Sequence, residues 1–205
     1  MGNDAPSLAG RLLSIGHSNH SMEKFIQLLR MHHIEVLVDV RSHPYSKYAS
    51  HFDAQLLEDT VAGAGIRYLS LGRELGGRPE GSEFYDETGH VLYSRVAQSL
   101  VFQEGIARLE NGIRRFRVAI MCSEEDPSNC HRRLLIGRVL AQRGVALCHI
   151  RADGRLQTEE ELSKERSGRG GDTDQLPLFD GAQEIEWKST RSVLQKRQQP
   201  NSSVR

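Results

Sequence analysis

The side chains best suited to covalent chemistry lie in one short stretch, MCSEEDPSNCHR, which contains Cys122, Cys130 and His131. A cysteine thiolate is a nucleophile, and a neighbouring imidazole can accept the proton of the thiol. Because Pro127 interrupts regular structure, we expect Cys130 in the first turn of the helix that follows. The helix dipole and the adjacent Arg132 would then favour the thiolate form of Cys130.

Cys122 is a second candidate nucleophile. It ends an apolar stretch, RVAIMC, that is typical of a buried strand. A free cysteine in such a place is often only a small buried apolar residue, and Cys130 has the same alternative. Glu124 lies on the loop between the two thiols and is the carboxylate best placed to transfer a proton. The sequence alone does not decide which thiol is reactive.

Further polar side chains follow other apolar stretches of the chain. Arginines near helix N-termini favour an anion such as phosphate, which makes Arg41, Arg78 and Arg132 candidate phosphate ligands. Asp39 is a candidate catalytic carboxylate, with a structural ion pair to Arg41 as the alternative. The remaining candidate substrate-binding residues are His17, Asn19 and Tyr45.

Alternating patterns of strand and helix precede these residues. Five β-branched or apolar runs predict strands over residues 11–15, 35–40, 66–71, 117–122 and 145–150. Helical spacing lies between them, over residues 21–33 behind a possible Ser21 cap and through about 92–115. This alternation predicts an α/β fold with a mostly parallel sheet of about five strands and helices on both faces. The candidate residues would then collect at the carboxyl ends of the strands.

Composition limits the classes of protein to consider. The chain has 205 residues, with 27 Lys plus Arg against 27 Asp plus Glu. This balance excludes binding of nucleic acid by a whole-chain basic field. No apolar run approaches the roughly 20 residues needed to span a bilayer, and the three cysteines are too few for a disulfide framework. We therefore expect a cytoplasmic protein with reduced thiols and no membrane partner.

The chain divides into three predicted parts. Residues 1–10 are expected to form a flexible N-terminus, residues 11–150 an α/β core domain, and residues 151–205 a polar, largely flexible and irregular tail.

Cofactor motifs are absent from the sequence. Neither GxGxxG after the first strand nor GxxxxGK[ST] occurs. Seven residues separate Cys122 from Cys130, which is longer than the spacing in zinc ribbons. We therefore expect no cofactor, with a bound metal as the weaker alternative.

Four motifs resemble the bacterial and archaeal family called domain of unknown function 488. They are IGHSN, VDVRSHPYS, ELGGRP and MCSEEDPSNCHR, in this order, and the resemblance covers about residues 12–150. It implies an α/β domain without implying a reaction. The resemblance also implies a set of polar residues that the chain shares with the family. They are His17, Asp39, Arg41, Cys122, Glu124, Cys130, His131 and Arg132.

An apolar pentapeptide, QLPLF, stands alone in the polar tail and consists of Gln175, Leu176, Pro177, Leu178 and Phe179. It resembles the peptide by which bacterial proteins dock on the DNA polymerase sliding clamp. Two leucines and a phenylalanine can fill an apolar groove while glutamine makes polar contacts. The alternative is that these side chains fold back onto the core domain.

Together these features predict an enzyme of DNA metabolism or repair. It would act on a nucleic-acid base, a nucleotide or another phosphate-bearing substrate, and the tail would tether it to the sliding clamp. One alternative is a non-catalytic module that binds nucleotides or nucleic acid. Another is a metal-dependent hydrolase.

Overall fold

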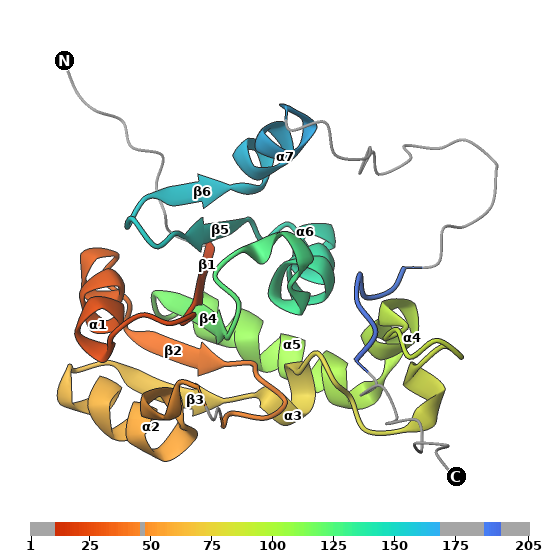
Figure 1. Ribbon diagram of the computed structural model, residues 1–205, viewed down its shortest axis with the longest axis horizontal. Helices are drawn as coiled ribbons and strands as arrows, with labels where there is room; N and C mark the ends of the chain where they lie inside the picture. Colours follow the sequence, from red (N-terminus) through yellow and green to blue (C-terminus); the bar gives the residue numbers. More distant parts are fainter. Residues whose placement is uncertain (1–10, 46–47, 169–186, 194–205) are drawn as a thin grey trace, which may run out of the picture.

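The computed structural model describes residues 11–45, 48–168 and 187–193, and its centre is a six-stranded sheet (Figure 1). In chain order the strands are β1 (Leu12–Gly16), β2 (Val36–Asp39), β3 (Arg67–Ser70), β4 (Val118–Cys122), β5 (Leu147–Ile150) and β6 (Leu156–Thr158). In space the order is β3-β2-β4-β1-β5-β6, and β6 alone of these six runs antiparallel to its neighbour. The predicted α/β architecture with a mostly parallel sheet is confirmed.

Seven α-helices and several shorter turns surround the sheet in the part of the chain that is described. The helices are α1 (Met22–Met31), α2 (Ala54–Gly63), α3 (Gly72–Leu75), α4 (Tyr93–Gln98), α5 (Leu100–Ile113), α6 (Arg138–Gln142) and α7 (Glu159–Gly168).

The central strands contribute to two apolar cores, because successive side chains of a strand point to opposite faces. On β4, Val118, Ile120 and Cys122 belong to one core, whereas Ala119 and Met121 belong to the other. Strands buried on both faces have continuous apolar sequences. The central strands could therefore be recognised from the sequence alone.

Helices α1 and α2 cover one face of the sheet. Phe25, Leu29 and Leu57 from these helices are completely buried in the core on that side. The predicted cap of α1 is present, since the Ser21 hydroxyl accepts a hydrogen bond from the Lys24 amide at 3.2 Å. The cap fixes where the chain enters the helix after the end of β1.

Helices α4, α5 and α6 lie on the opposite face. The helical stretch predicted over residues 92–115 is broken at Ser99, where the backbone is extended (φ −70°, ψ 143°). The Ser99 hydroxyl accepts a hydrogen bond from the Phe102 amide at 3.3 Å and begins α5. Because the serine hydroxyl can bond to nearby backbone groups, serine is favoured at the N-cap of a helix over its interior.

The sheet continues past residue 150, where the sequence predicted the start of a flexible tail. A turn with Gly154 at φ +89° reverses the chain, and β6 pairs with β5 before α7 begins. Strand β6 has three residues, of which two are polar, so it lacks the apolar run by which the other strands were recognised. The predicted flexible connector therefore does not describe residues 151–168.

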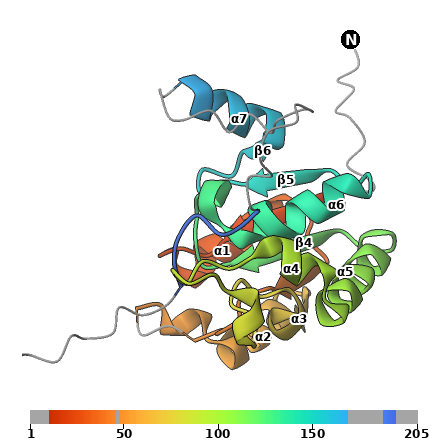
Figure 2. The ribbon, with the colours of Figure 1, turned by 90° about the vertical axis from the view of Figure 1, so that its right-hand side faces the viewer.

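Residues 187–193 return to the core and lie beside α4 (blue in Figures 1 and 2). The Ser189 amide donates to the Val91 carbonyl at 2.9 Å. The Trp187 indole donates to the Leu134 carbonyl at 2.9 Å. This part of the predicted tail is thus joined to the core by backbone and side-chain hydrogen bonds.

Two expectations fall outside the described residues: the flexible N-terminus at 1–10 and the pentapeptide at 175–179. Among the helices of the described ranges, none is long and apolar enough to cross a membrane.

Candidate active site

Strand β4 lies where the connections of the sheet change from one face to the other. Its neighbours β1 and β2 are followed by α1 and α2 on one face, whereas the chain after β4 leads into α6 on the opposite face (Figure 1). In parallel α/β sheets, ligands bind at the carboxyl ends of strands at such a switch point. The last residue of β4 is Cys122.

Three reactive side chains meet at this strand end. The Nδ1 atom of His131 lies 3.8 Å from the sulfur of Cys122 and 3.8 Å from the sulfur of Cys130. All three atoms lie within 4.8 Å of one another. The structure therefore brings together three of the predicted catalytic residues.

The imidazole of His131 is held in a fixed orientation. Its Nε2 atom is 2.9 Å from the Val40 carbonyl, which can only accept a hydrogen bond, so Nε2 carries the proton and Nδ1 presents a lone pair to the sulfurs. A side chain at Gly77 would come within 2.8 Å of the ring. The glycine of the ELGGRP loop thus permits the close approach of that loop to His131.

The electrostatic setting distinguishes the two thiols. The pKa of Cys122 is lowered to about 7, chiefly because the Cys130 thiol donates a hydrogen bond to it, with further contributions from the positive charge of Arg132 and from backbone amides. Burial and the neighbouring Cys122 raise the pKa of Cys130 well above its usual range. Cys122 is therefore the thiol that ionises more readily.

The helix-dipole prediction for Cys130 is wrong. A turn of 3-10 helix (Pro127–Asn129) precedes Cys130, whose own backbone is extended (φ −94°, ψ 140°). The following helical segment begins with a π-helix (Arg132–Gly137). Cys130 is thus outside the first helical turn and 2% exposed, so burial governs its ionisation.

Arg132 departs from its predicted role as a phosphate ligand. Its guanidinium is 1% exposed and donates to the carbonyls of Glu124 at 2.5 Å and Glu125 at 2.7 Å. Its Nε donates to the hydroxyl of Ser14, on β1, at 3.3 Å. The side chain therefore fastens the loop after β4 to the centre of the sheet.

Asp39 and Arg41 form the structural ion pair that the sequence left as an alternative. Their closest atoms are 2.6 Å apart, and both side chains are buried. Arg41 also lies 3.2 Å from Nε2 of His17, whose ring stacks on Phe52. Burial lowers the pKa of His17 to about 4, so this histidine is neutral near pH 7.

The other predicted residues are exposed. Tyr45 is 73% exposed, and Asn19 is exposed in the loop after β1. Arg78 is exposed as well, while its backbone amide donates to the Ser42 hydroxyl at 2.8 Å. The exposed Glu124 carboxylate lies 3.5 Å from Arg191. It is paired with residues 187–193.

Sequence reasoning missed Tyr93, which lies near the cysteines, and Trp187, which contacts Tyr93. Tyr93 is buried, and its pKa is raised first by burial and then by the negative charges of Cys130, Glu124 and Cys122. Trp187 contacts the Tyr93 ring edge-on at a centroid distance of 6.1 Å. Trp187 is the single tryptophan of the chain and stands in a polar segment, which is the one signal that pointed to it.

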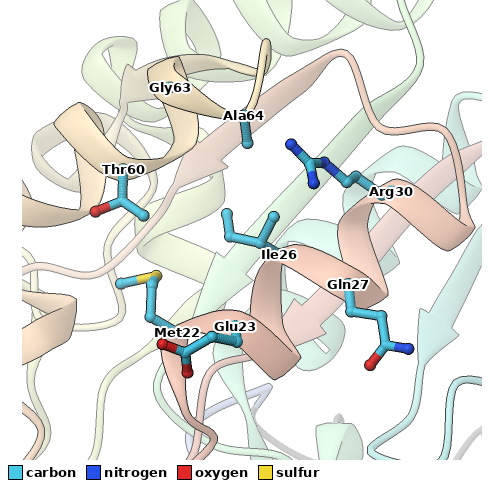
Figure 3. A pocket seen from close by; sticks show the side chains of 8 residues that line it. All are labelled: Met22, Glu23, Ile26, Gln27, Arg30, Thr60, Gly63 and Ala64. Carbon is cyan, nitrogen blue, oxygen red and sulfur yellow. The ribbon is translucent and has the colours of Figure 1, made fainter.

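A separate groove lies between α1 and α2 (Figure 3). Met22 and Ile26 supply apolar surface, and Glu23 and Arg30 supply charge. The groove contains none of the predicted site residues.

Comparison with known proteins places the chain in a family. No curated protein and no solved structure matches the chain significantly. The model of one protein family, described as "Domain of unknown function DUF488", matches residues 21–139, which is more than half of the chain and includes Cys122, Cys130 and His131. The chain therefore belongs to the DUF488 family.

Proposed function

We propose that this protein is an enzyme whose nucleophile is the thiol of Cys122. Its substrate in this proposal is a nucleic-acid base, a nucleotide or another phosphate-bearing group in DNA metabolism or repair. The observation that carries the proposal is the contact at the switch point of the sheet, where Nδ1 of His131 lies 3.8 Å from the Cys122 sulfur. A thiol beside an oriented imidazole is the arrangement of a nucleophile and its base.

The roles of the residues follow from this geometry. The proton of the Cys122 thiol passes to Nδ1 of His131, and the Val40 carbonyl stabilises the imidazolium through Nε2. The sulfur then bonds to an electrophilic atom of the substrate as the bond to the leaving group breaks. The imidazolium can return its proton to that leaving group. Glu124 lies on the adjoining loop, and we assign its exposed carboxylate, which lies 3.5 Å from Arg191, to further proton transfer.

Two exposed side chains among the predicted site residues support a nucleotide-like substrate. Arg78 directly follows Gly77, which packs against His131, and its side chain is exposed. Guanidinium groups bind phosphate by paired hydrogen bonds. Tyr45 exposes an aromatic ring of the kind on which bases stack. Because Arg41 and Arg132 bind protein atoms, Arg78 is the arginine that we assign to phosphate.

The tail gives the proposal its cellular context. The pentapeptide at residues 175–179 would dock Leu176, Leu178 and Phe179 in the apolar groove of a sliding clamp. Tethering raises the local concentration of the enzyme at DNA without a basic surface. We place the protein in the cytoplasm, where thiols remain reduced.

Cys122 is expected to react with iodoacetamide faster than the other two cysteines in metal-free buffer at pH 7. The imidazole of His131 assists ionisation of Cys122, whereas Cys148 is buried in the opposite core. Mass spectrometry of the protein after a short exposure measures this order. His131→Ala should slow the labelling of Cys122, because it removes the imidazole that can accept the proton of the thiol.

Cys148→Ser is the matched control and should leave the labelling of Cys122 unchanged. Equal labelling rates for Cys122 and Cys148 in the native protein would contradict the proposal. So would labelling of Cys122 that is insensitive to His131→Ala.

The full-length protein is expected to bind a bacterial sliding clamp, and the double variant Leu178→Ala, Phe179→Ala to lose this binding. Both substitutions remove apolar anchors of the peptide, and such anchors supply most of the binding energy of a short motif. Surface plasmon resonance with immobilised clamp measures both proteins. Equal binding by the two would place the contact elsewhere, and no binding by either would remove the link to DNA.

A further inference from the structure

We propose that Cys122, Cys130 and His131 form a binding site for a thiophilic divalent cation of the Zn²⁺ class, with the two sulfurs and Nδ1 as ligands. The inference goes beyond the proposed enzyme and does not depend on it. A cation at this place uses the same sulfur lone pair as the nucleophile. Metal-bound and metal-free protein would therefore differ in thiol reactivity.

The separations of the three atoms fit one tetrahedral ion. Zn–S bonds of about 2.3 Å and Zn–N bonds of about 2.0–2.1 Å, at tetrahedral angles, put sulfur and nitrogen about 3.6 Å apart and two sulfurs about 3.8 Å apart. Both sulfur-to-Nδ1 distances are 3.8 Å. The three atoms all lie within 4.8 Å of one another. An ion can therefore reach all three atoms with side-chain shifts of no more than about 1 Å.

His131 is already oriented as a metal ligand. Metal-binding histidines donate their second ring N–H to a carbonyl or carboxylate, which fixes the tautomer and directs the free lone pair at the metal. Nε2 of His131 makes this contact with the Val40 carbonyl at 2.9 Å. The lone pair of Nδ1 faces the two sulfurs. The close packing of Gly77 on the ring limits other orientations.

Charge also favours a divalent ion. Two thiolates and one neutral imidazole balance the charge of Zn²⁺, so binding of the ion would release the thiol protons and leave a neutral centre. Backbone amides of Ser123 and Glu124 donate towards the Cys122 sulfur, as amides around metal thiolates commonly do. The buried Arg132 donates to the carbonyls of Glu124 and Glu125, so its guanidinium is directed at the backbone of the loop after β4.

Three protein ligands leave one position of a tetrahedral ion for water or a substrate atom. Structural zinc sites use four protein ligands, whereas catalytic sites use three. His131 is partly exposed and Cys122 is 8% exposed, so the cluster lies at the boundary of the apolar core. Among the described residues no fourth His, Cys, Asp or Glu completes this cluster.

Titration of the reduced, metal-free protein with Co²⁺ tests the site. Cobalt bound to thiolates gives sulfur-to-metal charge-transfer absorption, which is a readout independent of enzyme activity. We expect the absorption to saturate at one Co²⁺ per chain and Zn²⁺ to displace it. Cys130→Ser and His131→Ala should each weaken Co²⁺ binding by at least about tenfold, because even outer-shell changes cost 10–100-fold in metal affinity.

Cys148→Ser is the matched control, because it removes the third thiol from the opposite core and should leave the absorption unchanged. Circular dichroism of each variant establishes that it is folded. Absence of charge-transfer absorption in the native protein would overturn the metal site, as would equal Co²⁺ affinity in native protein and Cys130→Ser. Selective alkylation of Cys122 in metal-free protein would survive that outcome, so the two proposals fail separately.

Discussion

Replacing Arg132 by methionine is expected to destabilise the protein by about 3 kcal/mol or more. Methionine fills much of the same volume but has no donor for the carbonyls of Glu124 and Glu125 or for the Ser14 hydroxyl. Each buried acceptor left without a partner costs about 1–3 kcal/mol. Urea unfolding followed by circular dichroism measures the change in the free energy of unfolding.

The adjacent Arg133 supplies the matched control. It is partly exposed and pairs with Glu159 at 2.8 Å, and the Glu159 side chain is 42% exposed. Ion pairs of this kind contribute at most about 1 kcal/mol, so Arg133→Met should cost far less than Arg132→Met. Similar losses in the two variants would show that Arg132 does not hold the loop after β4. Arg132→Lys should fall between them, because one ammonium cannot reach all three acceptors.

The contrast between Arg132 and its predicted role shows what spacing in a sequence can establish. Parallel strands end at a common edge, so the apolar runs before Cys122 and Asp39 sufficed to predict that these residues lie near one another. Spacing does not report which way an arginine points. Arg132 and Arg41 turn inward to carbonyls and a carboxylate, whereas Arg78 stays exposed.

The two cysteines illustrate a second limit. Their sequence contexts favoured Cys130, because a helix was expected to begin just before it. The turn Pro127–Asn129 delays the helix, and the Asp126 carboxylate caps that turn by accepting from the Ser128 amide at 2.9 Å. A shift of a few residues in a helix start is beyond sequence patterns. Burial and the hydrogen bond between the two thiols, which sequence patterns do not report either, distinguish Cys122 from Cys130.

Elements with little apolar pattern escaped prediction altogether. Strand β6 is stabilised by backbone pairing with β5, and residues 187–193 are held by backbone hydrogen bonds together with Trp187. Backbone hydrogen bonds form with almost any side chain, so pairing of this kind cannot be recognised from the sequence. The Trp187 indole also donates to a carbonyl of the π-helix, whose wide turns depart from the usual helical hydrogen-bond ladder.

Replacing Gly16 by alanine is expected to cost about 3 kcal/mol, at the upper end of the range for overpacking. A Cβ atom at Gly16 would lie 1.8 Å from the Glu124 carbonyl oxygen, so the backbone after β4 must move. That carbonyl also accepts from Arg132, and the adjoining amides support the Cys122 sulfur. Urea unfolding measures the loss of stability, and iodoacetamide labelling measures the reactivity of Cys122.

Gly63→Ala is the control, because a Cβ atom there meets nothing within 4 Å and Gly63 is the last residue of α2. Alanine in a helix is favoured over glycine by roughly 0.5–1 kcal/mol, so this variant should be neutral or slightly stabilised. If Gly16→Ala remains as stable as Gly63→Ala, β1 and the loop after β4 do not approach as closely as described. If Gly16→Ala is destabilised but Cys122 keeps its labelling rate, the loop affects folding without setting the reactivity of the thiol. Loss of both is the expected result, because the same backbone atoms anchor Arg132 and surround the sulfur.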